Sequence, residues 1–351
     1  MKRFSVVTVS VLGLIIVIAS GCSTEKNVAV NGNVNGNANG ASGGGKRLVI
    51  AAIPKCTGGE FWETVEQGAR DAAKDLDVRL KWEGTLTETE IAEQNKIIEN
   101  MINLGVAGMA IAPLNNKATA KSVAGAVDAG IPVVVFDSGL DGDKHIAFVA
   151  TNNRAGGALG GKHMVESLGE GNKKVLVLRY VQGTASTEKR AAGFIDTVTT
   201  AGMEVVADPY PEDGTVAGSK KTASNILEGY VNNGKLQLDG VFCCNLVSAL
   251  GMAAALEDLR KGNIAVAVTF IGFDTSPKLI KGLQAGEISA LVSQDPKKMG
   301  YIAVETIVKH LRDEPVERQV DTGVELVTAE RLEIEPSLRV LVGLKDKVAA
   351  N

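Results

Sequence analysis

Acidic, basic, amide and aromatic side chains follow several apolar runs of this 351-residue chain, and together they could bind a ring that carries many hydroxyl groups. Carboxylates accept hydrogen bonds, Arg and Lys donate them, and amides do both, which suits neighbouring hydroxyls. An aromatic pair offers flat faces for the apolar C–H side of a sugar ring. The candidate binding residues are Lys55, Phe61, Trp62, Asp137, Asn153, Arg190, Asp213, Asn245, Asp274 and Gln294.

Most of these residues also have a purely structural explanation. An Asn at a strand end is often a turn former or a helix cap, and Asp274 could cap the helix that follows it. Phe61 and Trp62 could be a hydrophobic cap. Asp137 and Asp274 could instead be the acid pair of a glycoside hydrolase, but the sequence shows no device that would separate their pKa values. We therefore expect a binding protein and not an enzyme.

Other ligand classes have less support in the sequence. It contains no Gly-rich phosphate loop, and its three His residues have no ligand-like spacing from a Cys, so we expect no metal or other cofactor. The net charge of −4 gives no electrostatic case for nucleic acid. Cys56, Cys243 and Cys244 are odd in number and two are adjacent, so we expect small buried residues; a bridge from Cys56 to either of the others stays open.

Apolar runs alternate with amphipathic stretches from Lys46 onward, and this alternation predicts parallel sheets with helical crossovers. Two such series favour two doubly wound α/β lobes over a single (β/α)₈ barrel. In such sheets ligands bind at the carboxyl ends of the strands, where the candidate residues fall. The predicted strands are 48–53, 78–82, 106–112, 132–136, 145–150, 174–180, 204–207, 240–244, 265–273 and 289–293, and the predicted helices are 61–76, 88–104, 118–129, 154–168, 187–201, 219–227, 248–261, 277–285 and 296–311.

The first 45 residues have the pattern of an export signal followed by a tether. A positively charged start precedes an apolar stretch over 4–18 and small residues that end at Cys22, which predicts a signal peptide over 1–21. The pattern resembles the lipobox of bacterial lipoproteins, whose Cys is lipidated, although Ala19 stands where that family usually has Leu. A plain cleaved signal peptide is the alternative. Residues 22–45, rich in Asn and Gly, predict a flexible tether.

This interpretation places the protein outside the cytoplasm, lipid-anchored to the periplasmic or extracytoplasmic face of a membrane. It leaves open whether the anchor lies in an inner or an outer membrane. The sequence contains no second run of 18 apolar residues, so we expect no other membrane span.

Several candidate residues stand in motifs of a known family. Gly59-Glu60-Phe61-Trp62 is similar to an Asn-Pro-Phe-Trp motif, Arg190-Ala191-Ala192-Gly193-Phe194 to a second motif, and Gly272-Phe273-Asp274 to a third. In order and spacing they resemble the type I periplasmic sugar-binding proteins of ABC importers, especially the ribose and allose binders. Lys55 matches a lysine of the allose type, whereas Ser138 stands where ribose binders have Arg.

The resemblance implies a role for each candidate residue. The implied roles are stacking by Phe61 and Trp62, acceptance of hydrogen bonds by Asp137 and Asp274, and donation by Lys55, Arg190, Asn245 and Gln294. Asn153 matches an Asn at the first crossover between lobes. The family has an aromatic residue near position 213 that is not visible here, and Glu212 or Asp213 could face the ligand instead.

The resemblance also implies the mechanism and the partners. It implies one lobe from 46–152 plus 295–323, a second from 153–294 plus 324–345, and a three-segment hinge that closes on the ligand. We expect a monomer that captures a pentose or hexose, with an allose- or ketose-like sugar favoured, and delivers it to an ABC permease. A sensory protein that presents its sugar to a chemoreceptor or sensor kinase is the alternative. No function is implied for residues 329–351.

Overall fold

A computed structural model describes residues 47–344 of the chain. The predicted signal peptide over 1–21, the predicted lipid acceptor Cys22 and the predicted tether that ends at residue 45 lie outside the described residues. The described part contains two six-stranded sheets and a short hairpin of β8 (Val231–Asn232) and β9 (Lys235–Leu236). Two separate sheets exclude the barrel topology and confirm the predicted α/β class.

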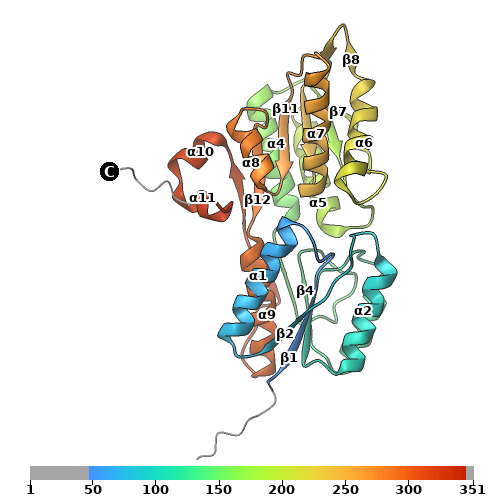
Figure 1. The fold of residues 1–351 in the computed structure, drawn as a ribbon, viewed down its shortest axis with the longest axis vertical. Coiled ribbons are helices and arrows are strands. Elements are labelled where there is room, and N and C mark those ends of the chain that lie inside the picture. Colours follow the sequence, from blue (N-terminus) through green and yellow to red (C-terminus); the bar gives the residue numbers. More distant parts are fainter. Residues whose placement is uncertain (1–46, 345–351) are drawn as a thin grey trace, which may run out of the picture. The chain divides into compact units, whose positions relative to one another are not determined.

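The first sheet has the strand order β13-β5-β4-β3-β1-β2, and all its pairings are parallel. Figure 1 labels its strands β1, β2 and β4. Its strands are β1 (Val49–Ile53), β2 (Arg79–Trp82), β3 (Gly108–Ile111), β4 (Val133–Phe136), β5 (Ala147–Ala150) and β13 (Gln319–Asp321). The helices packed on it are α1 (Glu60–Asp75), α2 (Ile91–Leu104), α3 (Ala120–Asp128) and α9 (Pro296–Leu311).

The second sheet has the order β14-β12-β11-β10-β6-β7 and is parallel except where the edge strand β14 pairs antiparallel with β12. Its strands are β6 (Lys174–Leu178), β7 (Glu204–Ala207), β10 (Gly240–Cys243), β11 (Thr269–Phe273), β12 (Ala290–Gln294) and β14 (Val324–Val327). Its helices are α4 (Asn153–Leu168), α5 (Ala185–Thr200), α6 (Val216–Glu228), α7 (Leu246–Lys261), α8 (Pro277–Gln284), α10 (Ala329–Ile334) and α11 (Pro336–Leu341).

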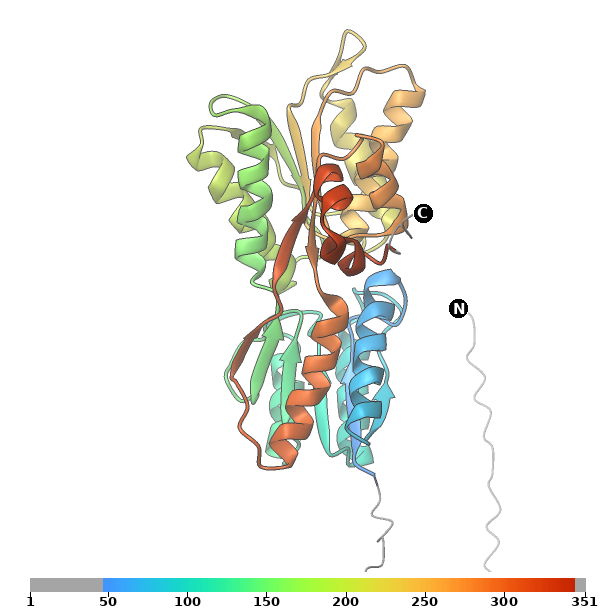
Figure 2. The ribbon, with the colours of Figure 1, turned by 90° about the vertical axis from the view of Figure 1, so that its left-hand side faces the viewer.

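The chain passes between the two sheets three times, as Figure 2 lets the reader follow. The crossings run from β5 to α4, from β12 to α9 and from β13 to β14. Neither sheet is therefore formed by one continuous segment. The lobe boundaries given above stay a prediction.

Burial on both faces explains why the strands read as continuous apolar runs. In β1, Ile50 and Ala52 face α1 and α9, while Ala51 and Ile53 face α2 and α3. The same alternation holds in β10, where Val241 contacts the cluster of α6, α7 and α8 and Phe242 the cluster of α4 and α5. Successive strand side chains point to opposite faces, so a doubly covered sheet needs apolar residues at every position.

Helix α2 begins three residues later than the sequence pattern predicts. The carboxylate of Glu90 accepts hydrogen bonds from the backbone N–H groups of Leu86 and Thr87, both at 2.9 Å. These bonds hold residues 86–90 as a turn before the helix starts at Ile91. Glu88 consequently lies on a loop at the carboxyl end of β2 and not in a helix.

Glycines allow two helix pairs to pack backbone against backbone. A Cβ atom added at Gly68 of α1 would lie 1.9 Å from the carbonyl oxygen of Lys297 in α9. In the second sheet, a Cβ atom at Gly157 of α4 would lie 1.9 Å from the carbonyl oxygen of Arg190 in α5, and one at Gly193 would lie 2.1 Å from that of Arg154. No side chain fits in such gaps, so these positions require glycine.

Gly193→Ala should lower the free energy of unfolding by about 1–3 kcal/mol, because the added methyl group forces α4 and α5 apart. Gly125→Ala is the matched control, since that helical glycine of α3 is exposed and has open space at its Cβ position. The control should raise stability by up to about 1 kcal/mol through helix propensity. Urea unfolding measures both variants, and the same sign of change in both would contradict the packing argument.

Candidate functional site

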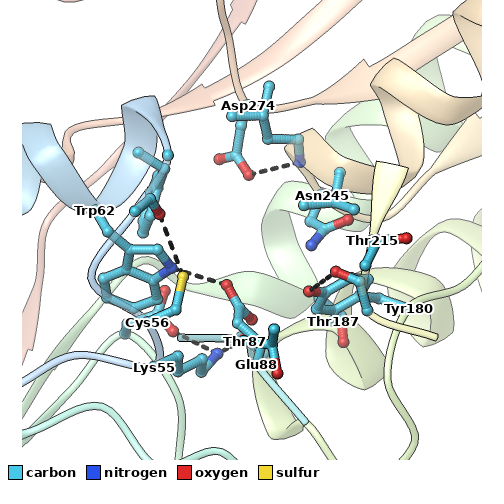
Figure 3. Close-up of a pocket in the computed structure, with 18 of the residues that line it drawn as sticks. Lys55, Cys56, Trp62, Thr87, Glu88, Tyr180, Thr187, Thr215, Asn245 and Asp274 are labelled. Carbon is cyan, nitrogen blue, oxygen red and sulfur yellow. Dashed lines mark hydrogen bonds and ion pairs between the residues drawn. The ribbon is translucent and has the colours of Figure 1, made fainter. Parts of the chain in front are cut away.

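A cavity of about 230 Å³ lies where the loops at the carboxyl ends of both sets of parallel strands meet (Figure 3). The volume is below the roughly 300–1,000 Å³ of pockets for drug-sized ligands, so it suits a small ring. The residues that line it are Lys55, Cys56, Gly58, Gly59, Phe61, Trp62, Leu86, Thr87, Glu88, Asp137, Tyr180, Ser186, Thr187, Arg190, Gly214, Thr215, Asn245, Leu246, Val247, Asp274 and Gln294.

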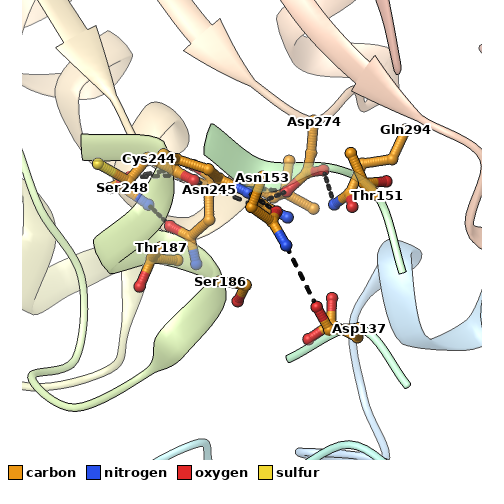
Figure 4. A network of polar contacts seen from close by, with 12 residues as sticks. Asp137, Thr151, Asn153, Ser186, Thr187, Cys244, Asn245, Ser248, Asp274 and Gln294 are labelled. Atoms are coloured by element: carbon orange, nitrogen blue, oxygen red, sulfur yellow. Dashed lines mark hydrogen bonds and ion pairs between the residues drawn. The ribbon is translucent and has the colours of Figure 1, made fainter. Parts of the chain in front are cut away.

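Eight of the ten candidate residues from the sequence line this cavity. The other two have different contacts. The side-chain oxygen of Asn153 accepts from Arg190 Nε at 2.7 Å, and its nitrogen donates to the carbonyl oxygen of Asp137 at 3.4 Å, so Asn153 lies beneath the site (Figure 4). Asp213 accepts from the backbone N–H and the hydroxyl of Thr215 at 2.8 and 2.6 Å, which makes it a local turn residue at the start of α6.

Lys55 and Asp137 form an ion pair at one side of the cavity. Lys55 Nζ lies 2.6 Å from Asp137 Oδ2, and each residue is only 3% exposed. Lys55 Nζ also donates to Ser186 Oγ at 3.2 Å, which joins the loop after β1 to the start of α5. The pair therefore has its charges satisfied inside the protein while it still lines the cavity.

The two buried aspartates occupy equivalent places in the two sheets. Each follows a Phe that ends a strand, and each has a positive φ, 58° at Asp137 and 70° at Asp274. Asp tolerates this left-handed conformation better than most residues, although it still costs about 1–2 kcal/mol. The shared backbone turn points a carboxylate into the cavity from each sheet.

Arg190 is held on several sides by neighbouring groups. Its guanidinium lies over the ring of Phe273, with Cζ 3.8 Å from the ring centre, and Nη1 donates to the carbonyl oxygen of Cys244 at 3.1 Å. Nη1 also lies 3.6 Å from Asp274 Oδ2. Contacts of this kind fix the orientation of a planar donor, so little side-chain entropy is left to lose on binding.

The amide of Gln294 is oriented by Asp274. Gln294 Nε2 donates to Asp274 Oδ1 at 2.7 Å, so its carbonyl oxygen is the group left over, and this buried atom has no hydrogen-bond partner among the described residues. The sequence-based interpretation assigned donation to Gln294; in the structure its nitrogen donates to Asp274, and its oxygen is the atom without a partner. Asp274 Oδ2 accepts from the N–H of Leu246 at the start of α7, at 3.1 Å.

An aromatic wall closes the side of the cavity formed by α1. Phe61 and Trp62 meet edge to face with ring centres 5.0 Å apart, and Trp62 also contacts Phe136 edge to face at 6.3 Å. Trp62 Nε1 donates to Glu88 Oε1 at 2.8 Å. The wall therefore presents flat apolar faces with a carboxylate at its edge.

The sequence reasoning missed several polar residues of the cavity. Glu88 escaped because its loop was predicted as the first turn of a helix. Tyr180 was predicted as the end of a strand, but its hydroxyl donates to the Gly214 carbonyl oxygen at 3.1 Å and its ring lines the cavity. Applying the strand-end rule to β2 would have found Glu88. The remaining missed polar residues are Thr87, Thr187 and Thr215.

Burial raises the pKa of two carboxyl groups in the cavity. For Asp274 the burial effect is opposed by Arg190 and by the hydrogen bonds from Gln294 and Leu246. For Glu88 burial is opposed by Lys55 and the Trp62 bond, whereas Asp137 and Asp274 raise its pKa further. The cavity is thus a poor place for additional negative charge.

The three cysteines of the described part are free thiols, which contradicts the open alternative of a bridge. Cys243 and Cys244 are buried, as expected, and burial raises the pKa of both thiols. Cys56 is partly exposed at the cavity, and burial raises the pKa of its thiol to about 12.

Within residues 47–344, no cluster of three His, Cys, Asp or Glu side chains could hold a metal ion. None of the helices in this part of the chain has the length and apolar character needed to span a membrane.

Comparison with known proteins gives a consistent result. The model of a family described as periplasmic binding protein domain matches residues 50–315. The D-ribose/D-allose-binding protein of Pseudomonas aeruginosa is 30% identical over 292 residues, which cover 80% of this chain and 88% of that protein. These findings confirm the resemblance seen in the sequence motifs. The relatives are named as binding proteins and not as enzymes, which confirms the expectation of a binding protein.

Solved structures agree with this comparison. A carbohydrate transporter solute-binding protein from Agrobacterium radiobacter, in complex with D-arabinose, is 32% identical with a TM-score of 0.77, over 85% of this chain and 99% of that one. An ABC transporter solute-binding protein from Agrobacterium vitis, with bound D-fucose, is 31% identical with the same TM-score, over 83% and 98%.

Glu88→Gln should stabilise the unliganded protein at neutral pH and have little effect in acid. A carboxyl whose pKa is raised by folding costs nothing below its unfolded value, near 4.5, and destabilises the fold as the pH rises from there through the folded value. Gln carries no charge and avoids this loss of stability, so the melting temperature of the variant should exceed that of the wild type by more as the pH rises. Glu63→Gln, an exposed change on α1, is the control. A gain that is equal at all pH values would refute the assignment.

Proposed function

This chain belongs to the periplasmic binding protein family, and we propose that it captures a monosaccharide between its two lobes and delivers it to the permease of an ABC importer. The observation that carries the proposal is the cavity itself, where side chains from both sheets converge with hydrogen-bonding groups still available. The relative named for D-ribose and D-allose, and the similar structures titled with D-arabinose and D-fucose, support a sugar as the ligand.

The orientations of the lining groups support a polyhydroxylated ring. Asn245 caps α7 with its side-chain oxygen, which accepts from Ser248 N at 3.0 Å, so its NH₂ group is left for a ligand. The oxygen of Gln294 and the carboxylates supply acceptors, and Arg190 supplies donors. Phe61 and Trp62 would contact the apolar face of the ring. Asn153 would position Arg190, and Asp213 would act through the loop that carries Thr215.

Closure of the lobes around a hinge is part of this proposal. Loops of the two sheets contact one another directly: Ser186 N donates to Ser138 Oγ at 3.1 Å, and Thr184 Oγ1 donates to the Leu114 carbonyl oxygen at 3.2 Å. Ligand contacts to both lobes would favour such a closed arrangement. Ser138, which stands where ribose binders have Arg, favours an allose- or ketose-like sugar over ribose.

Asn245→Asp should weaken sugar binding at least tenfold while it preserves the fold. Aspartate keeps the oxygen that caps α7 but replaces the NH₂ donor by an acceptor, and a lost hydrogen bond with an unpaired partner costs about 1–3 kcal/mol. A thermal-shift screen of pentoses, hexoses, ketoses and polyols first identifies the sugar, since a ligand that binds only the folded state raises the melting temperature. Calorimetry with that sugar then measures the variant.

The control for this experiment is urea unfolding of the unliganded variant, whose cooperative transition should show that it is folded, although the added negative charge in the cavity should lower its free energy of unfolding. Wild-type affinity in Asn245→Asp would remove Asn245 from the site. If no compound of the panel raises the melting temperature, the proposed ligand class is wrong.

We also propose that Cys22 carries a lipid that holds the protein at the outer side of a membrane. Cys22→Ser should release the mature protein from the membrane fraction into the soluble extracytoplasmic fraction, because the hydrophobic anchor is lost. Immunoblotting of the two fractions measures this, and an unchanged membrane-bound fraction would contradict the anchor.

A sensory role remains the competing function, and a deletion strain distinguishes the two. Loss of the protein should abolish uptake of the radiolabelled sugar if the protein serves an importer. If uptake persists while the transcriptional or chemotactic response to the sugar is lost, the sensory role is correct.

A further inference from the structure

The charges around the cavity do not balance. Five of the lining side chains are carboxyl groups or strong bases: the cations Lys55 and Arg190, and the carboxyl groups of Glu88, Asp137 and Asp274. The two cations lie in ion pairs with the two aspartates, at 2.6 and 3.6 Å. Glu88 is the third carboxylate, and it forms no ion pair with any described residue.

The surroundings of Glu88 offer only a neutral donor. Its Oε1 accepts from the indole N–H of Trp62 at 2.8 Å, while the side chain is partly buried at the cavity. Asp137 and Asp274 both add negative potential at its carboxyl group, and the cation that opposes them, Lys55, is already paired with Asp137. In its ionised form Glu88 therefore lacks a counter-charge beside the aromatic wall.

A buried acceptor at the same cavity has no donor among the described residues. The carbonyl oxygen of Gln294 has no hydrogen-bond partner among the described residues, the residue is 3% exposed, and it lines the cavity. Buried polar atoms are satisfied in the great majority of cases, so this atom calls for a donor from the ligand. An ammonium group carries three N–H donors and no acceptor, whereas a hydroxyl carries one donor.

We propose that the preferred ligand is an amino derivative of a monosaccharide, with its ammonium group paired with Glu88. This inference rests on the proposed sugar-binding function and specifies its substrate class. An ammonium would supply the positive charge that the lining residues lack, and hydrogen bonds to a charged partner are about twice as strong as neutral ones. A neutral sugar would leave the third carboxylate without a counter-charge in a desolvated site.

Calorimetry at neutral pH with D-glucosamine, D-galactosamine and D-mannosamine, each against its parent hexose, tests the proposal. At least one amine should bind about tenfold tighter than its parent, as expected for a hydrogen bond to a charged group. Glu88→Gln keeps the size of the side chain and the bond to Trp62, and it should reduce this preference to about onefold. Glu63→Gln, on the exposed side of α1, should keep the preference.

Each outcome decides between the hypotheses. If parent hexoses bind as tightly as the amines, or if Glu88→Gln keeps the preference, the amine proposal is wrong while the sugar-binding function stands. If neither the amines nor any sugar of the broader panel binds, both fail. Thermal unfolding of Glu88→Gln without ligand shows whether the variant is folded. Binding of the parent hexoses by the same variant shows whether its sugar site is intact.

Discussion

The ion pair between Lys55 and Asp137 is the contact on which the arrangement of the site depends. Both groups are almost fully buried, and removing water from two charges costs several kcal/mol per ion unless each finds its partner. The pair joins the loop after β1 to the end of β4, and the bond from Lys55 to Ser186 extends it to the second sheet. Loss of either partner would leave an uncompensated charge at the junction of the two sheets.

On the opposite side of the cavity, the carboxylate of Asp274 contacts several groups at once. Asp274 is the common partner of Arg190, Gln294 and the first N–H of α7, so one carboxylate orients a cation, an amide and a helix. The helix N-terminus adds its own favourable potential for a negative group. Because Asp274 uses these groups from three separate elements, their directions are set together. A ligand would therefore meet groups that are already oriented, which reduces the entropy lost on binding.

The sequence predicts much of the fold and of the site, for identifiable reasons. Strands covered on both faces are apolar throughout, so runs such as 132–136 could be recognised, and the strand-end rule then located Asp137 and Asp274. The role of Gln294 could not be predicted, because the contact that uses its nitrogen comes from another strand. Asp213 differs again, since its partner Thr215 is two residues away and local bonding competes with a ligand role.

The edge strands and the start of α2 show where local patterns are insufficient. β13 and β14 are short and partly exposed, so neither shows a strong apolar pattern in the sequence. The strands they pair with also lie far away along the chain. The start of α2 depended on one side chain, Glu90, which bonds two backbone N–H groups and holds the preceding turn. A helix pattern read from apolar spacing cannot see such a bond, and the consequence was that Glu88 was assigned to the wrong element.

The glycines bring two pairs of helices into direct backbone contact. Trp62 lies on α1, which touches the backbone of α9 through Gly68, and α9 starts at the crossing after β12. Arg190 lies on α5, whose backbone touches α4 through Gly157, and α4 starts at the crossing after β5. With no side chain between the backbones to absorb a displacement, we expect the two helices of each pair to move together. A displacement of either of these two residues would thereby reach a segment that joins the sheets.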